Sequence, residues 1–284
     1  MFLIIGYVII LAASLGTYAV HGSLAALWVP MEYLAIIGLM IGGFVAGNGP
    51  KAIKATIGAL PSVLKGSPYN KALYVDLLAL LYEILAKVRK EGLMSIEGDI
   101  ENPESSPIFG KYPSVTADHH AVEFLTDYLR MMVGGNLNAF EIENLMDMEI
   151  ETHHVEAHQA PHIVSKVADA LPAFGIVVAV MGVVNVMGSV GQPPAVLGKM
   201  IGGALVGTFL GILVSYGFVA PIASQLEQKV EESGKIYQVM KVVLLASMNG
   251  YAPQVAIEFG RKVLFANDRP GFVELEEEIK SRKG

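Results

Sequence analysis

Four long apolar stretches, arranged as two pairs, constrain the fold of this chain more than any other feature. At about 1.5 Å per residue, each is long enough for a helix to cross a hydrocarbon core of about 30 Å. The sequence therefore predicts an all-α fold, a polytopic membrane protein with four transmembrane helices and a helical cytoplasmic domain. The four stretches are Phe2–Val20, Met31–Gly47, Ala168–Gly188 and Ile201–Val219.

The polar residues divide the chain further, because they gather in one large block and in the tail rather than being scattered. Only 17% of the residues are charged and 53% are hydrophobic, which is typical of a chain that buries much of its length in lipid. The first apolar stretch lacks a basic leader, so we interpret it as a retained span rather than a signal peptide. The predicted segments are 1–50 (transmembrane helices one and two), 51–166 (cytoplasmic helical domain), 167–223 (transmembrane helices three and four) and 224–284 (cytoplasmic helical tail).

Basic residues follow the second stretch, whereas the two short connections, 18–30 and 189–200, hold only Lys199. The positive-inside rule therefore places the large block, the tail and both termini in the cytoplasm. The chain has no cysteine, so we expect no disulfides. Its net charge is −7 and its sequence shows no basic patch, so we do not expect it to bind nucleic acid. The basic residues after the second stretch are Lys51, Lys54, Lys65 and Lys71.

Apolar residues at helical spacing predict the cytoplasmic elements, and no alternating strand pattern of useful length appears. A loop at Asn249–Pro253 divides the tail into two helices, the second of which is expected to end near Ala266. The other predicted helices cover Tyr74–Glu91, Val122–Val133, Asn138–Glu151 and Ser224–Met248.

Ionisable residues are nearly absent from the spans, since the acids are only Glu32 and Asp169, each at the start of a stretch. A membrane protein that moves polar cargo normally buries ionisable groups at mid-depth. Either this chain moves no ions, or a partner supplies the missing group. Glycines instead recur on the spans and predict close helix packing, either within the chain alone or also between copies of it. They are Gly38, Gly42, Gly43, Gly47, Gly175, Gly182, Gly203, Gly207 and Gly211.

Prolines and histidines are the remaining distinctive residues. Pro172 is expected to open span three and Pro221 to close span four, as helix ends or kinks. The His153–His162 stretch holds His154, His158 and His162 at four-residue spacing, but Pro161 is expected to end the helix before His162. A solvated polar face is thus favoured over a metal site. The sequence contains no P-loop, no G-x-G-x-x-G after a strand and no HExxH, so no enzyme activity and no cofactor are expected.

Several blocks, in order along nearly the full length, resemble the MotA family of flagellar stator subunits within the MotA/TolQ/ExbB proton channel family. The resemblance implies five copies around two copies of a single-span partner, MotB, in the bacterial inner membrane. MotB brings the essential pore aspartate, which accounts for the missing acid. The blocks are Asp76–Tyr82, Asp99–Pro103, Phe140–Glu143, Leu171–Ile176, Gly207–Gly211 and Asn249–Pro253.

The resemblance also implies residue roles. Arg89, Glu97 and, less directly, Glu149 match charges that engage the rotor protein FliG. Pro172 and Pro221 match the prolines that couple ion passage to movement. In sodium-driven relatives a threonine occupies the position that matches Ala179, and span four carries a pair of threonines. Of that pair only Thr208 is present here, so we expect H⁺ as the coupling ion.

The alternatives left open are a sodium-driven stator, an ExbB/TolQ-type energy-transducing pump subunit, a self-contained channel and a purely structural membrane scaffold.

Overall fold

Helices make up the regular structure in the part of the chain that the computed structural model describes, residues 2–135 and 138–282, and no strand occurs there. The predicted all-α class is confirmed. The chain divides into two compact units, each built from two segments. The span unit comprises Met1–Gly66 with Ala157–Gln228, and the second unit comprises Ser67–Glu156 with Lys229–Gly284.

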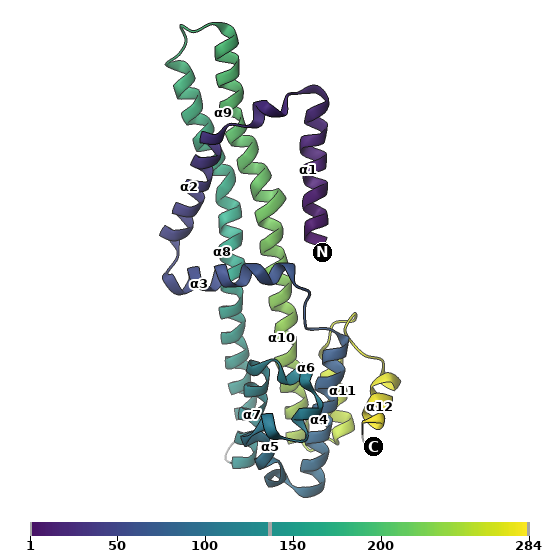
Figure 1. Cartoon of the computed structure of the whole chain (residues 1–284). Helices are drawn as coiled ribbons and strands as arrows, with labels where there is room; N and C mark the ends of the chain where they lie inside the picture. Colours follow the sequence, from purple (N-terminus) through teal and green to yellow (C-terminus); the bar gives the residue numbers. More distant parts are fainter. Residues whose placement is uncertain (1, 136–137, 283–284) are drawn as a thin grey trace. The chain divides into compact units, whose positions relative to one another are not determined.

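The span unit contains four helices that are long and apolar enough to cross a membrane, which confirms the four predicted spans (Figure 1). The first two are α1 (Phe2–His21) and α2 (Pro30–Gly47), joined by the short 3₁₀ helix η1 (Leu24–Leu27). The third lies within α8 (Ala139–Met187) and the fourth begins with α9 (Pro194–Val214). A shorter helix, α3 (Pro50–Ala59), follows α2 and runs across the direction of the spans.

Four expectations about helix ends are wrong. Span four begins at Pro194 rather than Ile201, because proline suits the first turn of a helix, where its missing N–H is not needed. Pro161 and Pro172 both lie inside α8, so neither ends a helix. Pro221 does not close span four: it is the second residue of α10 (Ala220–Met248), which continues the same helical run.

The second unit has its own apolar core, in which α4 (Lys71–Glu91) is the central helix. Leu77, Leu78, Leu80 and Leu81 of α4 are fully buried. The Asn70 side chain accepts a hydrogen bond from the Leu73 N–H, so the helix starts three residues before the predicted Tyr74. Parts of α8 and α10 also belong to this unit. The other α-helices that lie wholly within it are α5 (Glu97–Glu101), α6 (Pro113–Thr116), α7 (His119–Gly134), α11 (Pro253–Val263) and α12 (Phe272–Ser281).

Candidate ion path and rotor-facing surface

Glycines allow α8 and α9 to approach each other with their backbones almost in contact. A Cβ atom on Gly175 would lie 2.7 Å from the Gly207 carbonyl oxygen and 3.0 Å from the Gly211 Cα. A Cβ on Gly211 would lie 2.8 Å from both the Gly175 Cα and the Leu171 oxygen. Distances below 3.0 Å leave no room for a side chain, so these positions require glycine. The close packing predicted for spans three and four is confirmed at these three residues.

The same contact brings together the residues expected near the ion path. The backbone nitrogen of Ala179 lies 3.3 Å from the position that a Gly207 Cβ would take, and Thr208 is the next residue of α9. Ala179 is buried and Thr208 is half-buried. Among the described residues, the Thr208 hydroxyl has no hydrogen-bond partner, whereas Ser14 donates to the Ile10 carbonyl at 2.6 Å. The Thr208 hydroxyl therefore remains available for other partners.

Pro172 leaves one backbone carbonyl of α8 without its helical donor, because proline has no N–H to offer the residue four positions earlier. That residue is Ala168. The hydroxyl of Ser215, a fully buried residue, donates a 2.6 Å hydrogen bond to the Ala168 oxygen. Since an unpaired polar group is costly in an apolar environment, this bond stabilises the proline site and links spans three and four. Sequence reasoning missed this role of Ser215.

A short π-helical segment, Ser215–Val219, separates α9 from α10. Pro221 cannot donate to the Gly217 carbonyl, and its ring crowds that oxygen. The wider π turn just before Pro221 is the usual way in which a helix accommodates such a disruption. Both prolines of the site thus coincide with local departures from regular α-helical hydrogen bonding, and Ser215 belongs to both.

A cleft of about 1430 Å³ lies at the end of the spans where α1 ends and α2 begins. Thr17, Glu32, Asn185 and Lys199 line it together with apolar side chains. In the predicted orientation this end of the spans faces outward. The sequence places Glu32 at the start of a span, but it gives no sign that Lys199, from the other pair of spans, shares a cleft with it.

Arg89 and Glu97 are exposed at the two ends of a short connection in the second unit. Arg89 lies in the last turn of α4 and Glu97 is the first residue of α5. Neither has an ion-pair partner within the described part of the chain. Between them, in the 3₁₀ helix Leu93–Ile96, the side chains of Leu93 and Met94 are also exposed. Free charges beside exposed apolar side chains are typical of a contact surface.

Glu149, the third expected rotor-facing acid, differs from these two because it has a partner. It is exposed on α8 and accepts a 2.8 Å hydrogen bond from the Tyr128 hydroxyl. Burial of Tyr128, together with this bond, raises the pKa of the Tyr128 hydroxyl well above its usual range. The hydroxyl therefore stays protonated and holds the Glu149 carboxylate in place.

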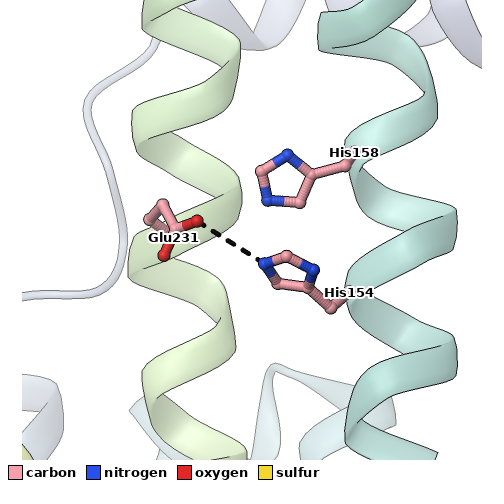
Figure 2. Close-up of side chains that lie close together, drawn as sticks. All are labelled: His154, His158 and Glu231. Carbon is pink, nitrogen blue, oxygen red and sulfur yellow. Dashed lines mark ion pairs between the residues drawn. The ribbon is translucent and has the colours of Figure 1, made fainter.

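The histidine stretch continues α8 as a helix, so the expected break at Pro161 does not occur. Figure 2 shows His154 on α8 facing Glu231 of α10, and His158 further along α8. The His154 Nε2 lies 3.5 Å from a Glu231 carboxylate oxygen. His153 packs on the Tyr237 ring with 4.6 Å between ring centroids. Burial, with nearby His120, lowers the pKa of His153, so this imidazole is neutral at pH 7.

The chain is similar to known proteins along its whole length. Residues 4–92 match the family model described as motility protein A N-terminal, and residues 117–238 match that of the MotA/TolQ/ExbB proton channel family. Motility protein A of Escherichia coli K12 is 51% identical, covering 100% of this chain and 96% of that protein. Motility protein A of Salmonella typhimurium is 49% identical, covering 99% and 96%.

The fold agrees with solved structures as well. A chain in the structure of the flagellar MotAB stator complex from Bacillus subtilis superimposes with a TM-score of 0.75 at 28% identity, covering 94% of this chain and 96% of that chain. The protein described here therefore belongs to the MotA/TolQ/ExbB proton channel family. Within that family it is a member of the motility protein A group, the stator subunits of the flagellar motor.

Proposed function

We propose that this chain forms, with a single-span MotB partner, a proton-conducting complex of the bacterial inner membrane that applies torque to the flagellar rotor. The observation that carries this proposal is that the spans pack closely through glycines while the sequence places no acid in the middle of any span. The MotAB complex from Bacillus subtilis supports MotB as the partner. In the proposed complex, five copies of the chain surround two copies of MotB, and both termini of the chain face the cytoplasm.

The proton reaches the partner's aspartate along a path lined by spans three and four, near Ala179 and Thr208. Protonation removes the cost of a charge in a dry environment, so the preferred contact of that side chain with the surrounding chains changes. Each proton that crosses releases about 2.3 kcal/mol per 100 mV of membrane potential. This energy is enough to shift a packing equilibrium between two arrangements of comparable stability.

The choice of H⁺ over Na⁺ rests on the small number of oxygen ligands. A bare Na⁺ must be surrounded by several oxygens, whereas a proton needs one titratable carboxylate and a chain of water. Ala179 offers no side-chain oxygen, and Thr208 offers a single hydroxyl. Two hinge positions flank this path: Pro172 with the Ser215 hydrogen bond, and Pro221 after the π turn.

The second unit transmits the motion to the rotor protein FliG through Arg89, Glu97 and Glu149. Arg89 and Glu97 support this role because they are exposed and have no ion-pair partner among the described residues. Glu149 lies on α8, the helix that also carries Pro172 and Ala179. One continuous helix thus contains residues of the ion path and of the contact surface.

Reversing the charge of Arg89 tests the rotor contact. We expect Arg89→Glu to reduce swimming speed at least several-fold while the amount of assembled stator in the membrane stays unchanged, because the side chain is exposed and forms no ion pair or hydrogen bond within the described chain. Lys90→Glu is the matched control, because Lys90 is the next residue and its side chain is 81% exposed. Its 3.6 Å ion pair with Glu91 is exposed and contributes little to stability. Loss of assembly in Arg89→Glu, or an equal loss of speed in both variants, would contradict the proposed contact.

A further inference from the structure

Helix α3 and the 3₁₀ helix η2 (Leu60–Leu64) present three different sides to their surroundings. One side is formed by Ala52, Thr56 and Val63, which are buried against the span unit. Val63 belongs to an apolar cluster with Val164 and Ala223, so this side holds the segment to α8 and α10. The remaining two sides face away from the protein.

The second side is apolar and exposed. Ile57 is 56% exposed, Leu60 39% and Leu64 61%, although all three are large hydrophobic residues. Ile57 lies near the end of α3, and Leu60 and Leu64 are the first and last residues of η2, so the three exposed apolar side chains lie close together along this segment. Exposed apolar side chains grouped in this way indicate a surface that is covered by something apolar.

The third side is cationic. Lys51 and Lys54 are exposed and lie one turn apart at the start of α3. Residues 50–66 contain a further lysine, Lys65, and no acid, so the segment carries a charge of +3 from its three lysines. The long lysine stems can reach along the helix while the ammonium groups remain in water or at a polar boundary.

The position of α3 fixes where these sides lie. Only Asn48 and Gly49 separate it from α2, whose 18 residues make a helix of about 27 Å, close to the thickness of the hydrocarbon core. Figure 1 shows α3 running across the direction of α2 rather than continuing it. A helix that turns sideways immediately after a span of this length lies at the lipid–water boundary.

We propose that α3 and η2 form a binding surface for the anionic phospholipids of the cytoplasmic leaflet, with Ile57, Leu60 and Leu64 in the acyl region and Lys51 and Lys54 at the lipid phosphates. An apolar strip and an adjacent basic strip are the features of a helix that lies in the plane of a membrane interface. The positive charge without acids selects negatively charged headgroups over zwitterionic ones. This inference depends on the membrane insertion of the spans and does not depend on which ion the complex conducts.

Photoactivatable lipids test the surface directly in the full-length stator complex. The complex is reconstituted with phosphatidylcholine containing a trace of diazirine-labelled phosphatidylglycerol or diazirine-labelled phosphatidylcholine, and labelled peptides are located by mass spectrometry. We expect the wild-type peptide covering residues 55–64 to be labelled more by phosphatidylglycerol than by phosphatidylcholine, by up to about 25-fold for two lysines near an anionic lipid. Because a lysine near an anionic surface contributes about a fivefold preference, K51Q/K54Q is expected to lower that preference by up to about 25-fold, to the level of phosphatidylcholine.

Two further variants make the result decisive. K90Q/K262Q removes two exposed lysines from the second unit and is expected to leave the labelling of residues 55–64 unchanged. K51R/K54R keeps both charges and is expected to retain the phosphatidylglycerol preference, even if the glutamine variant assembles poorly. Equal labelling of the wild-type peptide by both lipids would overturn the proposal. Absence of labelling by either lipid would also overturn it, because a protein surface would then cover α3.

Discussion

Replacing Gly211 by alanine is expected to disrupt the stator complex, because the added methyl group has no space between spans three and four. The new Cβ would lie 2.8 Å from both the Gly175 Cα and the Leu171 carbonyl oxygen, and these backbone atoms cannot move aside as a flexible side chain can. Overpacking of this kind typically costs about 1–3 kcal/mol. Because α8 and α9 must separate to relieve the clash, we expect loss of swimming together with a reduced yield of assembled complex, measured by size-exclusion chromatography after extraction.

Gly202→Ala is the matched control for this experiment. Gly202 lies on the same helix, and its added Cβ would meet no atom of this chain within 4 Å. We expect normal yield and near-normal swimming from this variant. If Gly211→Ala assembled and swam as well as Gly202→Ala, the close approach of α8 and α9 would be wrong.

The second large effect is expected at Asp99, a buried acid of the second unit. Its carboxylate accepts a 2.7 Å hydrogen bond from the Lys87 ammonium and a 2.6 Å bond from the Ser106 hydroxyl. Ser106 in turn accepts from the backbone N–H groups of Ile108 and Phe109. Asp99→Ala would leave both donors unpaired, and we expect it to lower the free energy of unfolding of this unit by about 2 kcal/mol.

Amide hydrogen exchange in the full-length protein measures this change. For amides in α4 and α5 that exchange through opening of the unit, 2 kcal/mol corresponds to about 30-fold faster exchange. Glu101→Ala is the control, since Glu101 forms a 2.8 Å pair with Arg130 in which both side chains are about half exposed. Such pairs contribute below about 1 kcal/mol. Equal exchange rates in the two variants would show that Asp99 is not the centre of a stabilising network.

Sequence patterns predict most of this fold because hydrophobic length and helical spacing are local properties. The four spans and helix α4 follow directly from runs of apolar residues, and the close packing at Gly175, Gly207 and Gly211 follows from their spacing. The helix ends that were predicted at prolines are wrong for a physical reason. Pro161 and Pro172 remove one hydrogen bond each, and a long helix tolerates this when its neighbours compensate, as Ser215 does at the Ala168 carbonyl.

The features that the sequence did not predict depend on contacts between distant segments. Ser215 is separated from Ala168 by 47 positions, and no local pattern connects them. The cleft that Glu32 shares with Lys199 likewise joins two separate pairs of spans. The roles of Arg89, Glu97 and Thr208 were inferred from family resemblance, and the structure adds that the first two side chains are exposed and that the Thr208 hydroxyl is available.

The central claim is that this chain forms the wall of an ion path while its partner supplies the titrating acid. Proton flux into liposomes, driven by a potassium diffusion potential without sodium, tests it most directly. The comparison is between this chain alone and this chain reconstituted with a single-span MotB partner, from which any segment that closes the pore has been removed. We expect flux only with the partner, and its loss when the partner's intramembrane aspartate is changed to asparagine. Voltage-driven proton flux through this chain alone would contradict the claim.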